Sequence, residues 1–412
     1  MSTKKTQLAG KTTANEGGFT RGYRLLCVFL LVVLGFSLGA SEFIVIGIEP
    51  DIADYYNVTL AQAGQLISFF AITYAVLTPV LALTTGRFKR FQLLVAYSVI
   101  FCVANLVQAM APSFEVLLAS RVLIGAVSGA FLAVGVTFIP ELMGAGRTSM
   151  VISVVYAAFS VAMVLATSLG KLAAEFLGWQ VALWATLVLA IVTCAALIAI
   201  LPKKGATDEP ATFSEQAGLL KEPQVITCIG IFVFGVGSTY VFYGYVTPYL
   251  EGVLGMDAMS ASATLMAYGG VCFVSNLISG WVDARFGIKA LLVVFVLQAA
   301  SLLGLWATGA AMPAGLVMVM CVGLLMYVAS VPCISMFMRT ASMRHPKALT
   351  LASSLEPMAF NIGIAFGTFV GGLVVSGPGI SQVGLVGACF SLVAMALVAV
   401  TLKIAHKEGI RR

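Results

Sequence analysis

The feature that most constrains the fold is a series of long apolar runs, each close to the roughly 20 residues that a helix needs to cross a bilayer. The chain has 412 residues, of which 60% are hydrophobic and only 10% are charged, whereas about a quarter of the residues in soluble domains are charged. So few charged side chains cannot cover a water-facing surface, which excludes a soluble enzyme, a nucleic-acid-binding protein and a disordered chain. We predict an all-α membrane protein with twelve transmembrane helices. The runs cover about residues 25–48, 61–84, 92–111, 115–140, 149–171, 180–201, 224–248, 258–282, 289–309, 313–338, 348–375 and 380–404.

The distribution of charge predicts how the chain is oriented in the membrane. All of the 23 basic residues except Arg121 and Lys171 fall in the two tails or in loops on one side of the predicted bilayer. Cytoplasmic loops carry the excess of Lys and Arg, so both termini are expected in the cytoplasm. The loops on the opposite side are acidic and include Glu49, Asp51 and Glu251.

The chain divides into two similar halves. The longest polar segment, 203–223, is predicted to be a cytoplasmic linker between an N-terminal six-helix half, 1–202, and a C-terminal half, 224–412. Residues of the two halves correspond at a nearly constant offset, since Pro50 aligns with Pro248 and Gly125 with Gly323. Several such matches in chain order indicate an internal duplication.

The loop between the eighth and ninth runs is predicted to be a gate. Asp283 can accept hydrogen bonds at a helix end, and Arg285 and Lys289 can bind a neighbouring helix end. The corresponding loop between the second and third runs keeps only its basic residues, among them Arg87 and Arg90. The alternative is a loop that only marks the cytoplasmic side. The predicted gating residues are Gly280, which is expected to let two helices approach closely, Asp283, Arg285, Gly287, Lys289, Arg87 and Arg90.

Two charged residues lie well inside predicted spans at a similar depth. Arg121 belongs to the fourth run and Glu42 to the first. A lone charge in a membrane is costly, so we expect the two side chains to be partners. Burial favours a neutral carboxyl group and a nearby guanidinium favours an ionised one, so Glu42 can bind and release protons. The alternative is a static salt bridge that only fixes packing.

The eleventh and seventh runs supply the other candidates. Glu356 is a second carboxylate within a span and is predicted to carry a proton or to bind a cationic or polyhydroxylated substrate. Tyr240 and Tyr243 offer a wall suited to sugars or aromatic compounds, although Tyr240 also suits the aromatic belt of a membrane interface, where Tyr249 is expected. The predicted substrate-binding residues are Tyr240, Tyr243, Asn361 and Asn276.

Several of these motifs resemble a known family. Residues 280–289 resemble the GxxxDRxGRR loop of the major facilitator superfamily, and Arg121 with Gly125 resembles the RxxxG element of its fourth helix. Residues 41–53 and 359–372 resemble the first and eleventh helices of bacterial arabinose-efflux-like sugar efflux permeases and drug:proton antiporters. The resemblance covers residues 21–405 and implies two pseudo-symmetric six-helix halves that export a substrate by alternating access, driven by inward proton flow. The fifth helix departs from the antiporter pattern at Ala166 and Thr167.

The predicted function is therefore proton-coupled efflux of a sugar or a small drug-like compound. The expected partners are a small-molecule substrate, protons and the lipid bilayer of a bacterial inner membrane, with no nucleic acid, no metal or other cofactor, and a monomeric protein. One alternative is an uptake symporter or facilitator for a small metabolite, and another is a membrane sensor that binds a ligand without moving it. An enzyme is not expected, because no nucleophile–base pair or metal-ligand set lies within the spans.

Overall fold

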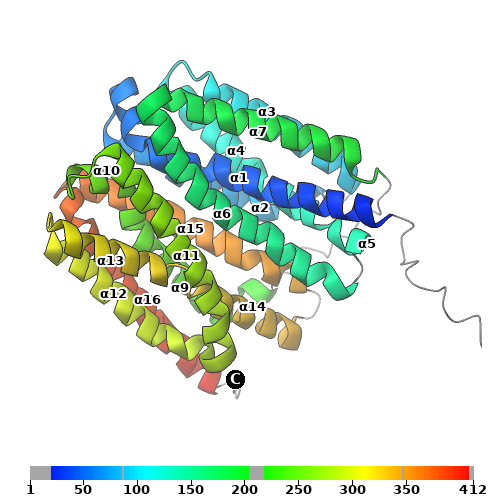
Figure 1. Ribbon diagram of the computed structural model, residues 1–412. Helices are drawn as coiled ribbons and strands as arrows, with labels where there is room; N and C mark the ends of the chain where they lie inside the picture. Colours follow the sequence, from blue (N-terminus) through cyan, green and yellow to red (C-terminus); the bar gives the residue numbers. More distant parts are fainter. Residues whose placement is uncertain (1–19, 86–87, 144, 204–217, 346–347, 408–412) are drawn as a thin grey trace, which may run out of the picture.

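The computed structural model describes residues 20–85, 88–143, 145–203, 218–345 and 348–407, and every regular element in these ranges is a helix (Figure 1). The elements are α1 (Arg21–Tyr56), α2 (Leu60–Thr85), α3 (Arg90–Ala109), α4 (Phe114–Val136), α5 (Ile139–Met143), α6 (Ala145–Leu177), α7 (Trp179–Ile200), α9 (Pro223–Tyr243), α10 (Val246–Gly252), α11 (Ala258–Phe286), the 3₁₀ turn η1 (Gly287–Ala290), α12 (Leu291–Thr308), α13 (Met312–Leu325), α14 (Ser330–Arg344), α15 (Leu349–Ser376), the 3₁₀ turn η3 (Ile380–Gln382) and α16 (Val383–Lys407).

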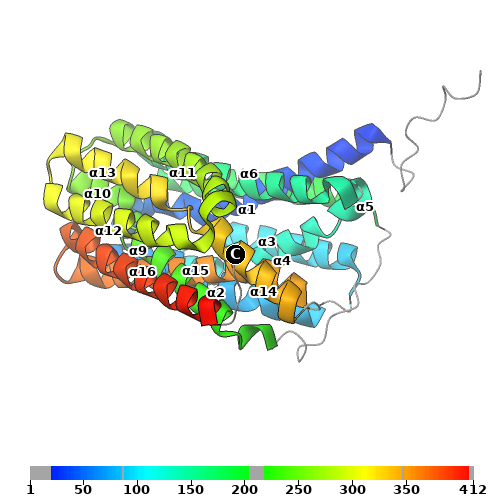
Figure 2. The same cartoon turned by 90° about the horizontal axis from the view of Figure 1, so that it is seen from below.

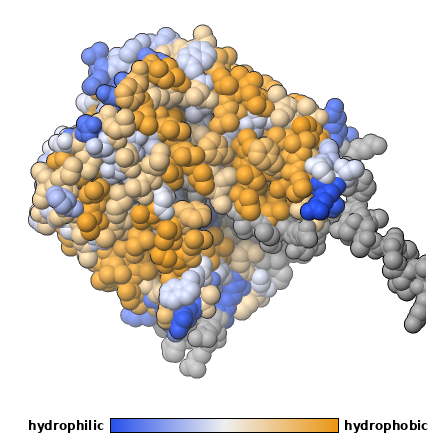
Figure 3. All heavy atoms as spheres, viewed as in Figure 1, coloured by the Kyte–Doolittle hydropathy of each residue, from blue (hydrophilic) through white to orange (hydrophobic). Residues whose placement is uncertain are grey.

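The predicted all-helical membrane fold is confirmed. Among the described residues, eleven continuous segments are long and apolar enough to cross a membrane. One of them, Ala258–Thr308, contains both α11 and α12, which η1 joins. The segments therefore agree with twelve crossings. Figure 3 shows the apolar residues gathered over the middle of the visible face and the hydrophilic ones at its margins, as expected of a surface that faces lipid.

The helices form two groups that lie against each other. Figure 1 shows α1–α7, from blue to green, as one group and α9–α16, from green to red, as the other, and Figure 2 shows the same two groups from below. The predicted linker, 203–223, lies mostly outside the described residues, which resume at Gly218. We call the end of the bundle that holds the turns at Asn57, Gly178 and Gly255 the distal end, and the end where α1 begins and α16 ends the proximal end.

Each group is built around one closely packed helix pair. In the first group α1 packs on α6, and in the second α9 packs on α15. A side chain at Gly47 would overlap the carbonyl of Thr167, and one at Gly367 would overlap the backbone of Gly237. Only glycine allows these backbones to come so close. These two close contacts therefore pack each half internally.

The most extensive contacts between the groups are those of α2 with α15 and of α6 with α11, and α1 also contacts α10.

Two spans of the C-terminal group are interrupted where a proline removes a backbone donor. Pro248 leaves the carbonyl of Gly244 without its helical partner, and the span breaks there into α9 and α10. Pro332 likewise leaves the carbonyl of Val328 without its helical partner, and that span breaks between α13 and α14. Helix α1, in contrast, continues through Pro50. The apolar runs alone predicted unbroken helices at 224–248 and 313–338.

Candidate functional site

Arg121 is fully buried and binds three backbone carbonyl groups of its own half. Its guanidinium donates to the carbonyl oxygens of Ser41 at 2.6 Å, Glu42 at 2.8 Å and Leu66 at 3.2 Å. The group also lies 4.5 Å from the centre of the Phe70 ring. Arg121 thereby fastens α4 to α1 and α2, and its charge is spread over carbonyl dipoles and an aromatic face.

The expected pairing of Arg121 with the Glu42 side chain is therefore corrected. The guanidinium binds the main-chain carbonyl of Glu42, and within the described chain these two side chains form no ion pair shorter than 4 Å. The carboxylate remains close enough for an electrostatic interaction. Glu42 is 5% exposed, and its Oε2 is buried without a hydrogen-bond partner.

Glu42 and Glu356 lie on opposite groups but border one shared space. Tyr74 on α2 and Tyr327, between α13 and α14, each lie within electrostatic range of both carboxylates. Glu356 on α15 interacts with the Ser330 hydroxyl group and is partly exposed. Tyr156 on α6 interacts with Glu356 yet is 40% exposed. Tyr74, Tyr156 and Tyr327 therefore lie near the carboxylates where the two groups meet.

An aromatic cluster forms the C-terminal wall of this space. The rings of Tyr243 and Tyr268 stack at 5.0 Å and those of Tyr327 and Phe360 at 5.4 Å, while Tyr240 meets Tyr243 edge-on at 5.5 Å. The cluster is buried, and the hydroxyl group of Tyr240 has no partner within the described residues. Tyr240 is thus inside the bundle, not in an interface belt.

The two candidate asparagines occupy different surroundings. Asn361 is 6% exposed and donates to the carbonyl of Pro357, and its Oδ1 is buried without a partner in the described structure. Asn276 on α11 is half-buried and follows Ser275, whose Oγ accepts from the backbone of Tyr327 at 2.9 Å. The amide oxygen of Asn361 and the Tyr240 hydroxyl group are thus two buried polar groups without a partner in the described structure.

The two groups are fastened together at the distal end. Lys171 on α6 forms an ion pair with Glu251 on α10 at 2.6 Å and a longer one with Asp51 at 3.9 Å. Ser262 on α11 donates to the carbonyl of Ser168 on α6 at 2.8 Å. We call these contacts, with the hydrogen bond described next, the distal gate.

A proline shapes the last contact of the distal gate. Pro50 has no backbone N–H, so the carbonyl of Ile46 loses its helical hydrogen bond. The hydroxyl group of Thr247, from the other half, donates to that carbonyl at 2.7 Å. A carbonyl exposed by the sequence of one half is thus satisfied by the other half, which favours their contact at this end.

The predicted gate loop at the proximal end has its contacts within the C-terminal half. Asp283 accepts a hydrogen bond from Ser335 on α14 at 2.6 Å, and Arg285 lies over the rings of Trp281 and Phe286. Gly287 ends α11 with φ of +58°, a conformation that favours glycine.

Other expectations for the predicted gates are corrected or untested. A Cβ at Gly280 would meet nothing within 4 Å, so the predicted close approach of helices there is wrong. Lys289 lies in η1, and its binding to a neighbouring helix end stays a prediction. In the N-terminal half, Arg90 donates to the carbonyl of Thr137 at 3.1 Å, and Arg87 lies outside the described residues.

A further ion cluster lies at the proximal end. Glu222 accepts from Arg344 at 2.5 Å and pairs with His345 at 2.9 Å, which ties the start of α9 to the end of α14. Partial burial opposes ionisation of Glu222, but the bonds from His345 and Arg344 outweigh it and lower the pKa of that carboxyl group. Among the described residues, no group of three or more His, Cys, Asp or Glu side chains is placed to hold a metal.

The fold and the site together define a class of protein. Twelve crossings in two groups, a polar space between the groups and bonds that join them at one end are the architecture of a secondary transporter. Sequence comparison then gives the family: a family described as Major Facilitator Superfamily matches residues 31–345. The chain therefore belongs to the major facilitator superfamily and is a multi-pass membrane transporter.

Relatives and solved structures agree with this assignment. The chain is 29% identical to the uncharacterized MFS-type transporter YtbD of Bacillus subtilis (strain 168), over 87% of this chain and 90% of that protein. It is 24% identical to the uncharacterized MFS-type transporter YfhI of the same organism, over 85% and 87% of the two chains. The fold resembles that of a bacterial homologue of the human lysosomal transporter Spinster in an inward-facing and occupied conformation, with a TM-score of 0.76 at 14% identity, covering 93% of this chain and 98% of that one.

Proposed function

We propose that this transporter exports a small hydrogen-bonding or cationic compound in exchange for protons. The observation that carries the proposal is the pair of carboxylates, Glu42 and Glu356, which approach one space from opposite halves. For neither one is an ion pair with a basic side chain found within the described chain. A carboxylate within a membrane span that lacks an ion-pair partner is costly, so a proton or a cationic substrate would offset its charge, and Arg121 adds only a longer-range attraction at Glu42.

The lining of the same space supports the proposed substrate class. The cluster of Tyr240, Tyr243, Tyr268, Tyr327 and Phe360 offers flat apolar surfaces for a sugar ring or an aromatic compound. The Tyr240 hydroxyl group and Asn361 Oδ1 are buried without partners and would bind hydroxyl or amine groups of the substrate. Arg121 is a positioning residue here, since it holds the main chain at Glu42.

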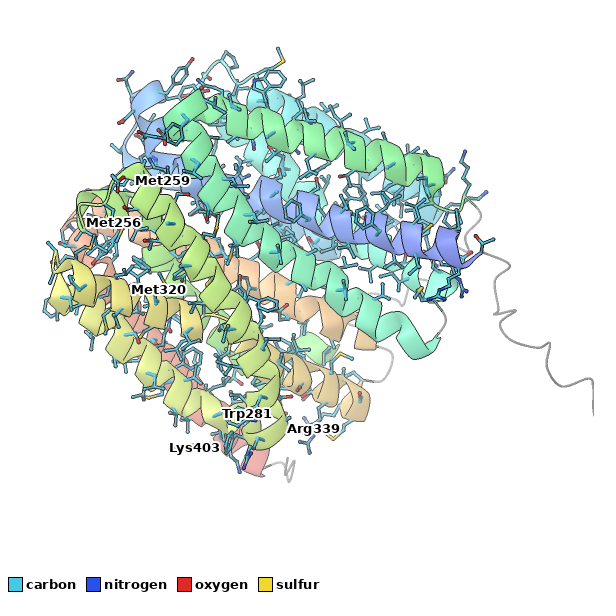
Figure 4. The ribbon with its side chains drawn as sticks, in the orientation of Figure 1. Met256, Met259, Trp281, Met320, Arg339 and Lys403 are labelled. Carbon is cyan, nitrogen blue, oxygen red and sulfur yellow. The ribbon has the colours of Figure 1, made fainter. Side chains whose placement is uncertain are left out.

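The proposed direction depends on orientation. Arg339 and Lys403 both lie at the proximal end in Figure 4. The basic side of a membrane protein is cytoplasmic, so the proximal end is proposed to face the cytoplasm. Export, with protons moving inward, follows from the resemblance to efflux permeases. An uptake symporter would use the same carboxylates with substrate and proton moving together.

The test is flux in proteoliposomes with an imposed pH gradient, across a panel of neutral sugars and aromatic cations. Glu42→Gln is close to isosteric and mimics the protonated acid, so we expect binding to remain and the response to the gradient to disappear. Glu42→Asp is the matched control and is expected to keep a response. A gradient response of Glu42→Gln equal to that of the natural protein would remove Glu42 from coupling and leave Glu356. Substrate moving in the same direction as protons would establish uptake instead.

A further inference from the structure

Glu49 is a third membrane carboxylate, and it is more isolated than the other two. The sequence predicted it in an acidic loop, but it lies within α1, directly before Pro50, and is 0% exposed. Both of its carboxylate oxygens are buried and have no hydrogen-bond partner among the described residues. Seven residues separate it from Glu42, so both lie on nearly the same face of α1, about 10 Å apart along its axis.

The residues around Glu49 belong to the distal gate. Three residues earlier, the Ile46 carbonyl accepts the hydrogen bond from Thr247 of the other half. Tyr245, which connects α9 to α10, lies within electrostatic range of Glu49. The hydroxyl group of Tyr245 donates to the carbonyl of Thr368 on α15 and contacts Gly64 on α2. Glu49 therefore lies where the two halves meet.

No basic group compensates Glu49 in this arrangement of the described residues. Lys171 is the basic residue of the distal gate, and its ammonium group is bound to Glu251 and Asp51. Helix α2 contains no charged residue, and Glu356, the acidic residue of α15, interacts with Ser330 in the central space. Arg121 on α4 is bound to carbonyls near Glu42. The titratable group that faces Glu49 most directly is the hydroxyl group of Tyr245, which carries no compensating charge.

An ionised carboxylate in these surroundings would be desolvated and unpaired, which strongly favours its neutral form. Separation of the halves at the distal end would bring water to Glu49 and remove that preference. We propose that Glu49 is a proton-binding site of the distal gate, which holds a proton while the gate is closed and releases it to water when the gate opens.

The proposal fixes the direction in which pH changes the opening of the distal gate. Acid on the distal side favours protonated Glu49 and the closed gate, whereas alkaline conditions favour the ionised form and the open gate. Opening linked to the loss of one proton responds to pH by up to about tenfold per unit. This inference rests on alternating access, which belongs to the proposed function, but on neither the substrate nor the role of Glu42.

The experiment measures the width of the distal gate directly. Spin labels on cysteines introduced at Glu175 on α6 and Met259 on α11, both exposed, report the separation of the halves in lipid nanodiscs from pH 5 to 9. Met259 lies at the distal start of α11 in Figure 4. The eight native cysteines are replaced beforehand. The expected result is a growing open population as the pH rises, and in Glu49→Gln a gate that stays closed throughout.

Two controls separate this site from the other carboxylates. Glu49→Asp keeps an ionisable group and is expected to keep the pH response, while Glu115→Gln removes an exposed carboxylate at the distal start of α4 and is expected to open with pH as before. The inference is overturned if Glu49→Gln opens with pH like the parent protein, or if the parent gate does not respond to pH at all. Since no substrate is present, a failure of proton-coupled export would appear in the flux assay and not here.

Discussion

The distal and proximal ends of the bundle differ in which parts of the chain their polar bonds connect. At the distal end, three bonds join one half to the other: Lys171 with Glu251, Thr247 with Ile46, and Ser262 with Ser168. They lie beside bonds within a half, such as Lys171 with Asp51 and Tyr56 with Ala111. At the proximal end, the bonds between described residues stay within one half. They include Asp283 with Ser335, Arg90 with Thr137, Tyr23 with Ile200, Thr340 with Gln224, and Glu222 with Arg344 and His345.

This difference shows how one bundle can close at one end and remain free to move at the other. Bonds between the halves must break when the distal end opens, so they determine how stable the closed state is. Bonds within a half move with that half and have little effect on the choice between states. Changes at the distal end should therefore alter which state is populated, and changes at the proximal end should mainly alter stability or rate.

The largest change in the population of the distal-open state is expected from Gly64→Leu in α2. A side chain at Gly64 would overlap the hydroxyl group of Tyr245, which is 1% exposed and hydrogen-bonded to α15. Overpacking of this kind costs about 1–3 kcal/mol, which would shift the population towards a distal-open state by roughly 5- to 150-fold. The measurement is the distal spin-label distance. Gly280→Leu is the matched control, since a Cβ there meets nothing, and an equal shift in both variants would contradict the comparison.

A smaller shift in the same direction is expected from Lys171→Met. The substitution leaves the carboxylates of Glu251 and Asp51 without their cation, and both are partly exposed. We expect the closed state to be destabilised by about 1–2 kcal/mol relative to the open state, which is less than the cost of breaking a fully buried ion pair. The readout is labelling of a cysteine at Met256, which is 7% exposed while the gate is closed.

Lys171→Arg keeps the charge and should keep the gate closed. Labelling of the Met256 cysteine in Lys171→Met at the rate of the parent protein would show that the ion pairs do not hold the gate.

A modest decrease in turnover is expected from Asp283→Asn at the proximal end. The amide oxygen can still accept from Ser335, but the bond loses its charge assistance, which is worth about 1 kcal/mol. We predict normal membrane insertion, slower turnover and an unchanged distal distance. Ser335→Ala removes the donor and serves as the matched variant. An opened distal gate in either variant would mean that the two ends are coupled through this bond.

The smallest effect, a slight loss of folding stability, is expected from Glu222→Gln. Because the pKa of Glu222 is lowered in the folded protein, its ion pairs contribute stability above the ordinary glutamate pKa of 4.5, which applies to the unfolded chain. That contribution disappears as the pH falls through the lower folded pKa. We expect the free energy of unfolding of the variant to be lower than that of the parent protein by about 0.5 kcal/mol at pH 7, and the two to be equal near pH 3. Thermal unfolding in detergent at the two pH values measures this, and a difference that persists in acid would contradict it.

Much of the fold was predictable because the bilayer leaves few choices. Long apolar runs must be helices, since lipid offers no partner for an unpaired backbone group. The family also followed from short motifs. The breaks near Gly244 and Val328 were not predicted, although Pro248 and Pro332 contain their signal.

The site was predicted less completely. Glu42, Arg121, Glu356 and Tyr240 were selected as polar residues in apolar runs, but the pattern could not show which atoms they contact. Tyr268 and Tyr327 were missed, although each is an isolated tyrosine within an apolar run. Tyr249 was expected at a membrane interface, yet it is 1% exposed and donates to the carbonyl of Leu305.

The sequence by itself determined the membrane class, the number of spans and the family, because these depend on hydropathy and local motifs. Only the tertiary structure decided what each charged residue faces, because helices distant in sequence supply the neighbours. The sequence predicted that Arg121 pairs with the Glu42 carboxylate, whereas in the structure Arg121 donates hydrogen bonds to three backbone carbonyl groups. The structure also moved Glu49 from an expected loop to a buried position between the halves, where ionisation depends on whether water can enter.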